Sequence, residues 1–230
     1  MIVLEKVSRE FKAEKILKEV DLVIKPSEIT SIVAPNGVGK TTLLCIIANV
    51  IFPTTGSIFF KNDFSKRDVF LILSGERNLY MKNTVYENIS YFCTLRGLKR
   101  KEIEENIEKH ADKMPLYAKI KNKLCEELSF GQKRLVIIFA AFVAGARCII
   151  MDEPSEGLDY AHLEMIEKML SIGKKDKIIL ITSHNYEFVS KIADRNIFLK
   201  SGEIAHKTGQ IDQDQLLEIY KKLYGEGGIE

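Results

Sequence analysis

The stretch that decides the fold reads Ala34-Pro35-Asn36-Gly37-Val38-Gly39-Lys40-Thr41-Thr42. It follows residues 28–33, an apolar segment typical of a buried strand, and it precedes residues 43–50, an apolar run long enough for a covered helix. A strand, a glycine-rich turn that ends in Lys-Thr and a helix form the arrangement that holds the phosphates of a nucleotide. The sequence therefore predicts a phosphate-binding loop over residues 34–42.

The residue types in this loop suit that task. Gly37 and Gly39 can adopt backbone angles that turn successive N–H groups toward an anion. The helix that follows adds its unpaired N-terminal donors and the positive end of its dipole. We expect Lys40 to reach the β- and γ-phosphates, Thr41 to ligate Mg²⁺ and Thr42 to donate near the α-phosphate. The predicted nucleotide-binding residues of the loop are Asn36, Gly37, Val38, Gly39, Lys40, Thr41 and Thr42.

The composition sets a few further limits. The chain has 230 residues, enough for one domain with a real core, and its 34 Lys and Arg against 32 Asp and Glu give a net charge of +2. The net charge is therefore too small to predict a nucleic-acid partner. The longest apolar run, residues 135–146, is shorter than the roughly 20 residues that span a bilayer. The N-terminus lacks the pattern of a signal peptide, which predicts a cytoplasmic protein.

The rest of the chain alternates between strand and helix patterns. Residues 1–33 read as half-solvated antiparallel strands that end in the buried strand. From residue 84 the character is helical, with an amphipathic stripe at Ile103, Ile107, Ala111 and Met114. We therefore expect a single α/β domain over residues 1–230 with a mainly parallel sheet. Its expected parts are a catalytic core (1–83 and 146–230) with an N-terminal antiparallel β subdomain, and an inserted helical subdomain (84–145).

Three more patterns follow the loop in order. Leu128-Ser129-Phe130-Gly131-Gln132 directly precedes the long apolar run, with Ser129 placed as a helix N-cap. The apolar strand pattern at 148–151 ends in Asp152-Glu153, and the one at 178–182 ends in Ser183-His184. A carboxylate pair directly after a buried strand would bury charge without a partner, which favours a metal site.

Together, the loop, L-S-F-G-Q, I-I-M-D-E-P and the strand before His184 resemble the ATP-binding-cassette (ABC) ATPases, the motor domains of ABC transporters, over essentially the whole chain. The resemblance implies ATP and Mg²⁺ as cofactors. It also implies that Asp152 binds Mg²⁺ through water, that Glu153 is the catalytic base that polarises the attacking water, and that His184 contacts the γ-phosphate. Phe11 matches the aromatic residue that stacks on adenine, and Asp159 matches the loop residue that communicates across the dimer.

The resemblance further implies partners. Ser129, Phe130, Gly131 and Gln132 occupy the signature motif, which in this family binds the γ-phosphate of ATP held by the other subunit. A second ABC ATPase subunit, identical or different, would therefore complete each site. A transmembrane permease subunit on a separate chain is the other implied partner, and it would hold the protein at the cytoplasmic face of the membrane.

Three departures from the family pattern stand out. Ala34 replaces the first glycine of the loop, and Phe130 replaces a glycine of the signature motif. The Gln expected on the loop after Leu73 is missing: Gly75 aligns there, and Glu76 beside it is a candidate Mg²⁺ contact. None of these removes a residue needed for hydrolysis, so we expect a competent ATPase.

The segment after Tyr86 looks like the branch of the family that exports drugs, peptides or lipids, which indicates an exporter. Two alternatives remain open from the sequence. One is a soluble ABC ATPase, for example in cluster assembly. The other is a weakly hydrolysing regulatory partner in a heterodimer, which the altered signature motif and the missing Gln suggest.

Overall fold

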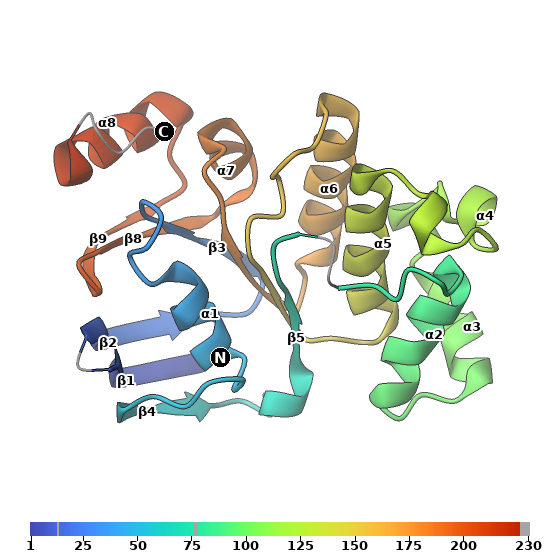
Figure 1. Cartoon of the computed structure of the whole chain (residues 1–230), viewed down its shortest axis with the longest axis horizontal. Coiled ribbons are helices and arrows are strands. Elements are labelled where there is room, and N and C mark those ends of the chain that lie inside the picture. The colour runs from blue at the N-terminus through green and yellow to red at the C-terminus, as the bar shows by residue number, and fades with distance from the viewer. Residues whose placement is uncertain (13, 76–77, 226–230) are drawn as a thin grey trace.

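The computed structural model describes residues 1–12, 14–75 and 78–225, and its strands form two sheets (Figure 1). The antiparallel sheet has the order β2-β1-β4, with β1 (Ile2–Phe11), β2 (Glu14–Ile24) and β4 (Thr55–Phe60). The larger sheet has the order β5-β6-β7-β3-β8-β9, and its strands are β3 (Glu28–Val33), β5 (Val69–Ile72), β6 (Cys148–Met151), β7 (Ile178–Thr182), β8 (Arg195–Lys200) and β9 (Glu203–Gly209). Only β9 runs antiparallel to its neighbour among these described strands. The predicted α/β fold, with a mainly parallel sheet and an antiparallel N-terminal sheet, is confirmed.

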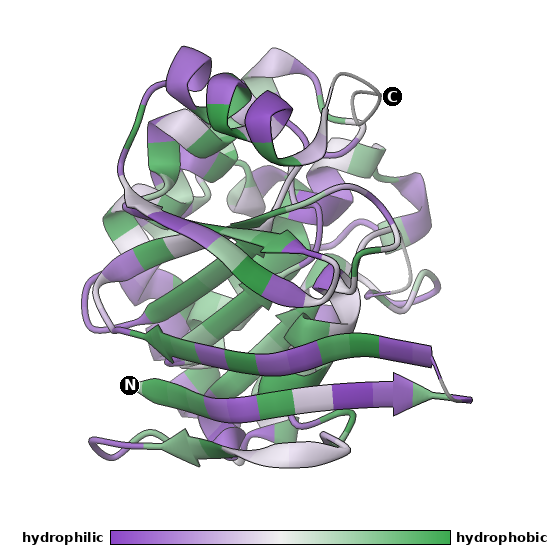
Figure 2. Cartoon of the chain, turned by 90° about the vertical axis from the view of Figure 1, so that its left-hand side faces the viewer, coloured by the Kyte–Doolittle hydropathy of each residue, from purple (hydrophilic) through white to green (hydrophobic). Residues whose placement is uncertain are grey.

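The antiparallel sheet is half-buried, as its sequence pattern predicts. Leu4 and Val7 of β1 and Leu22 of β2 are buried, whereas polar residues between them face solvent. Figure 2 shows these strands with alternating hydrophilic and hydrophobic segments, and the central strands behind them as almost continuously hydrophobic. The buried side packs against helix α1 (Lys40–Ile47), so this sheet covers the helix that follows the phosphate-binding loop.

Successive residues of the parallel strands enter different cores because side chains alternate across a sheet. In β6, Cys148 and Ile150 join the core formed with α1 and the antiparallel sheet. Ile149 and Met151 join the core formed with α5 and α6 on the opposite face. Both faces of the sheet are therefore covered, which explains why these strands read as unbroken apolar runs. The remaining helices are α2 (Val85–Leu95), α3 (Arg100–Lys109), α4 (Tyr117–Ile120), α5 (Phe130–Val143), α6 (Tyr160–Gly173), α7 (Tyr186–Ile192) and α8 (Gln213–Tyr224).

Helices α2 to α5 lie between β5 and β6 in the chain and beside the sheet in space (Figure 1). Helix α5 is buried along nearly all its length because α6 and the sheet cover one side and α2 and α3 cover another. A helix in such a place must be apolar all round, which accounts for the run at 135–146. Within the described ranges, no helix is both long and apolar enough to cross a bilayer.

One part of the helical prediction is wrong. The stripe from Ile103 to Met114 does not lie on one helix, since α3 ends at Lys109 and a 3₁₀ turn covers Ala111–Lys113. Ala111 is consequently exposed, while Met114 reaches the core by way of the turn. The backbone leaves the helical region at His110, with φ −110° and ψ 7°, and a spacing of four, four and three residues does not reveal such a break.

The order of the sheet places four strand ends side by side. β5, β6, β7 and β3 are parallel neighbours, so the residues after Ile72, Met151, Thr182 and Val33 meet at one edge. Crevices outside the carboxyl ends of parallel strands are the usual ligand sites of such sheets. The phosphate-binding loop also rests on the antiparallel sheet, because a Cβ on Gly39 would lie 2.9 Å from Cγ2 of Ile16.

Candidate functional site

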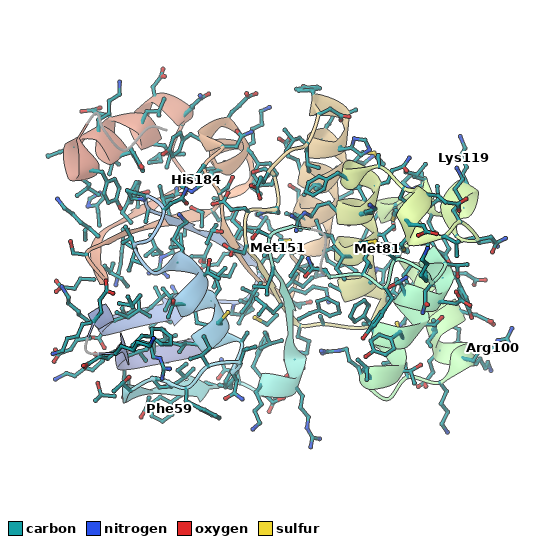
Figure 3. All side chains as sticks on the ribbon, in the orientation of Figure 1. Phe59, Met81, Arg100, Lys119, Met151 and His184 are labelled. Atoms are coloured by element: carbon teal, nitrogen blue, oxygen red, sulfur yellow. The ribbon has the colours of Figure 1, made fainter. Side chains whose placement is uncertain are left out.

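A cleft of about 630 Å³ opens at the carboxyl ends of the parallel strands. Figure 3 labels His184 at this edge and Met151 in the interior just before it, while Arg100 and Lys119 lie far away on the helical side. The structure brings most of the predicted nucleotide site together here. The predicted residues that line the cleft are Phe11, Asn36, Gly37, Gly39, Lys40, Thr41, Thr42, Asp152, Glu153 and His184.

The loop has the backbone that its glycines predict. Gly37 has φ +79° and Gly39 has φ +106°, both in the left-handed region. Gly39 is the N-cap of α1, which therefore directs its first N–H groups into the loop. Val38 is the exception among the predicted loop residues, because its side chain is half-buried against the core beneath α1 and does not line the cleft.

Lys40 is folded into the loop. Its Nζ donates to the carbonyl oxygens of Ala34 at 2.7 Å and Pro35 at 3.1 Å. The side chain is buried, and burial lowers the pKa of Lys40, whereas Glu153 and Asp152 act in the opposite direction. These contacts hold a cation at the floor of the cleft.

Asp152 accepts hydrogen bonds from the start of α1 and from the end of β7. Thr41 Oγ1 donates to Asp152 Oδ2 at 2.7 Å, and Thr182 Oγ1 donates to Asp152 Oδ1 at 2.6 Å. The carboxylate is buried, and both its oxygens accept hydrogen bonds. The end of β6 is thereby fixed to the start of α1 and to the end of β7.

Glu153 has an unusual environment for a carboxyl group. Its backbone is left-handed, with φ +48°, and its N–H donates to Thr182 Oγ1 at 3.0 Å. Oε2 accepts from the His184 N–H at 3.1 Å, whereas the buried Oε1 accepts no hydrogen bond from the described residues. Burial raises the pKa of Glu153 to about 7, against smaller effects of the His184 amide and Lys40.

The His184 side chain, just after β7, faces Glu153 and Lys40. Its Nε2 lies 3.1 Å from Lys40 Nζ, 2.9 Å from Asn36 Oδ1 and 3.2 Å from Glu153 Oε1. Burial, and next the Lys40 charge, lower the pKa of His184. The ring is therefore neutral at pH 7, with a nitrogen turned toward Lys40.

The signature residues lie outside this cleft, at the start of α5. Ser129 is the N-cap, as predicted: its Oγ accepts from the Gln132 N–H at 3.3 Å, and its own N–H donates to Gln132 Oε1 at 3.2 Å. Phe130 is half-buried and Gly131 is buried. Asp159 caps the next helix, α6, by accepting from the His162 N–H at 2.9 Å.

The sequence reasoning missed Thr182, which contacts both Asp152 and the Glu153 amide. Only the pairing of β6 with β7 brings this hydroxyl to the carboxylates, so no local pattern could have found it. Glu76, the candidate Mg²⁺ contact, lies outside the described residues. Other cleft-lining residues that were not predicted are Ile16, Ser74, Ser155, Glu156 and Asn185.

Among the described residues, three other hollows are of similar or larger size but are lined by different residues. One of about 680 Å³ lies between β1, β2 and β9 and is lined by charges of both signs. Another of about 1000 Å³ surrounds Arg67 and Arg96, and a third of about 740 Å³ lies beside Lys6 and Gly56. None of the three lies at the carboxyl ends of the parallel strands or contains the glycine-rich loop, so the 630 Å³ cleft is the candidate nucleotide site.

Comparison with known proteins identifies the family. The model of the ABC transporter family matches residues 17–156, more than half of the chain. The chain belongs to the ABC transporter family. It is an ATP-binding subunit of that kind and an ATPase, as the four motifs indicate.

Two curated ABC relatives match over about nine tenths of this chain. The chain is 29% identical over 213 residues to the tungstate uptake system ATP-binding protein TupC of Peptoclostridium acidaminophilum, which covers 90% of this chain and 98% of TupC. It is 31% identical over 219 residues to the ABC transporter ATP-binding protein NatA of Bacillus subtilis, over 90% and 89% of the two chains. Among solved structures, a dimeric bacterial ABC transporter cassette matches with a TM-score of 0.78 and 26% identity, over 92% of this chain and 99% of that one.

Proposed function

We propose that this chain hydrolyses ATP in the 630 Å³ cleft with Glu153 as the general base. The observation that carries the proposal is the state of this carboxyl group. It is half-buried at the strand edge, its Oε1 accepts no hydrogen bond from the described residues and lies 3.2 Å from His184 Nε2, and its pKa is raised to about 7. A base with a pKa near the working pH is well matched to taking a proton from water.

The loop would bind the phosphates, with Lys40 as the central cation. Its hydrogen bonds to the Ala34 and Pro35 carbonyls show that the ammonium group already lies inside the loop. In the bound state phosphate oxygens would take over these contacts, which is favourable because charge-assisted bonds are stronger. Phe11 is 40% exposed at the end of β1 and lines the cleft, so its ring is available for stacking on the base.

Mg²⁺ is the metal that the residues fit. The Thr41 hydroxyl and the Asp152 carboxylate converge at 2.7 Å, and hard oxygen ligands of this kind suit Mg²⁺. Thr41 would bind the ion directly and Asp152 through water. Bound there, Mg²⁺ would neutralise phosphate charge.

The partners follow from the same proposal. Ser129, Phe130, Gly131 and Gln132 would face the nucleotide of a second ABC ATPase subunit, with Asp159 at the same interface. The dimeric solved cassette supports this arrangement. A separate permease subunit would hold the chain at the cytoplasmic face of the membrane, with residues 84–145 as the helical subdomain that moves against the core. Nucleic acid is not among the proposed partners.

The direction of transport is a separate matter. The export type that the segment after Tyr86 indicated gains no support from the relatives, because TupC is named for uptake. We therefore propose an ATP-driven transporter subunit without assigning its direction or cargo. The soluble alternative predicts that the chain copurifies with no membrane protein, and the transporter proposal predicts a permease in detergent extracts.

Glu153→Gln tests the central assignment. The variant keeps the size of the side chain and the loop contacts of Lys40, so ATP binding is expected to remain. Phosphate release should fall by at least about 100-fold, the usual range for losing a general base. Hydrolysis by Glu153→Gln at the wild-type rate would show that another group activates the water.

A further inference from the structure

His162 joins two regions of the chain that the proposed function assigns to the partner subunit. Gly131 lies in the first turn of α5, and a Cβ placed on it would lie 2.6 Å from Cγ of the His162 ring. The other ring atoms Cδ2 and Nδ1 would be 2.8 Å from it. No real side chain tolerates such distances, so the ring rests directly on the backbone at Gly131 and only glycine fits there.

The ring is held in place from its own helix. His162 is in the first turn of α6, and Asp159 Oδ1 lies 2.7 Å from its Nδ1 as well as 2.9 Å from its backbone N. Hydrogen bonds from the amide and then the ring of His162 lower the pKa of Asp159, so this carboxylate is ionised and can only accept. The proton between them is therefore on Nδ1, and the residue that starts α6 also fixes the orientation of the ring.

A second contact joins the same two segments. The Phe130 ring lies beside the loop before α6, where a Cβ on Gly157 would be 3.4 Å from Phe130 Cε1. The guanidinium carbon of Arg134 lies 5.7 Å from the centroid of the same ring. Two successive residues at the start of α5 thus pack against the 157–162 segment.

We infer that His162 is a positioning residue that locks the first turn of α5 to the loop ending at Asp159, so that Ser129 and Asp159 meet a partner subunit as one rigid unit. The inference rests on the proposed function, in which both residues face that partner. His162 would not touch nucleotide in its own cleft, since it does not line it. Its effect would act through the Gly131 backbone and the Asp159 carboxylate.

The first experiment separates nucleotide binding from subunit closure. In His162→Ala, ATP binding by the isolated subunit should equal that of the wild type, because the cleft is untouched. ATP-dependent dimerisation, measured in the Glu153→Gln background, should weaken about tenfold or more. Turnover, measured with Glu153 intact, should fall by a similar factor, because misplacing a catalytic group is costly. His162→Asn keeps a donor for Asp159 and should recover part of the loss. Glu164→Ala, an exposed change on the same helix, is the matched control and should have no effect.

The second experiment tests the contact itself. Gly131→Ala should lose turnover because its methyl group meets the His162 ring, and adding His162→Ala should raise turnover about tenfold or more above Gly131→Ala. A double variant as inactive as Gly131→Ala, or wild-type dimerisation of His162→Ala, would overturn the inference. The proposed function fails separately, through a Glu153→Gln variant that hydrolyses ATP normally, so the two failures are distinguishable.

Discussion

Thr182 and Asp152 are joined across neighbouring strands by a 2.6 Å hydrogen bond from Thr182 Oγ1 to Asp152 Oδ1. The same hydroxyl accepts the Glu153 N–H at 3.0 Å, so one threonine orients both carboxylate residues. Its place at the end of β7 makes the pairing of β6 with β7 part of the site.

Thr182→Val should therefore harm the site and the fold together. The change leaves a buried amide and a buried carboxylate oxygen each without a partner, which should cost about 1–3 kcal/mol of unfolding free energy. Turnover should fall with it, because Glu153 loses its anchor. Denaturant unfolding and phosphate release measure the two effects. Thr182→Ser keeps the hydroxyl and should retain both properties, and equal damage by Ser and Val would contradict the role of the hydrogen bonds.

Lys40→Ala should weaken ATP binding without unfolding the chain. A charge-assisted contact to phosphate is worth about 1.5–3 kcal/mol, so the Kd should rise by about tenfold or more. Binding of a fluorescent ATP analogue measures this, with Lys25→Ala, an exposed lysine before β3, as the control. Unchanged affinity in Lys40→Ala would place the phosphates elsewhere.

The pH dependence of stability should report on Glu153. Its folded-state pKa of about 7 lies above the ordinary 4.5, so between these values the folded chain holds a proton that the unfolded chain has released. The free energy of unfolding contributed by this group therefore falls as pH rises through the window. Glu153→Gln cannot ionise. Its free energy of unfolding relative to the wild type should therefore increase by at most about 3 kcal/mol between pH 4.5 and pH 8. Thermal unfolding without nucleotide measures the gap, and a gap that stays constant with pH would contradict the raised pKa.

The pH dependence of turnover should also report the ionisation of Glu153. Only ionised Glu153 can accept a proton, so kcat/KM for ATP should rise as pH passes about 7. A profile that is flat from pH 6 to pH 8 would contradict this expectation.

Arg9 should tune base stacking through Phe11. The guanidinium carbon of Arg9 lies 4.2 Å from the centroid of the Phe11 ring, and Arg9 Nη1 donates to the Phe52 carbonyl at 2.9 Å. Phe11 lines the nucleotide cleft, whereas Arg9 lines the 680 Å³ hollow, so Arg9 contacts the ring without lining the nucleotide site. Arg9→Met should lose about 0.5–2 kcal/mol of this support, raising the KM for ATP a few-fold with kcat unchanged. Arg9→Lys should lose less, and a fall in kcat alone would point to another role.

Much of the fold followed from local patterns. The strands before Ala34, Asp152 and Ser183 were correctly predicted because a fully covered parallel strand is an unbroken apolar run. Lys40, Asp152, Glu153 and His184 were then expected at the same edge of the sheet, since each follows or lies near the carboxyl end of such a strand, and the observed strand order brings them together.

What could not be predicted depends on contacts between elements. The hydroxyl of Thr182 acts through the order of the sheet, and the His162 ring meets Gly131 from a different helix. The exposed position of Ala111 results from a helix end that its spacing does not mark. In the first two cases the decisive neighbour is distant in sequence, and in the third the helix ends at a residue that the spacing does not distinguish, so periodicity reveals none of them.

Ile16 touches more than the phosphate-binding loop. The position of a Cβ on Gly202, in the turn between β8 and β9, would collide with the Ile16 carbonyl, and the Lys18 N–H donates to the Gly202 carbonyl at 2.9 Å. Residues 16–18 of β2 therefore contact both the phosphate-binding loop and the turn between β8 and β9. A ligand that stiffens the loop would therefore also restrain the β8–β9 turn, because Ile16 contacts both.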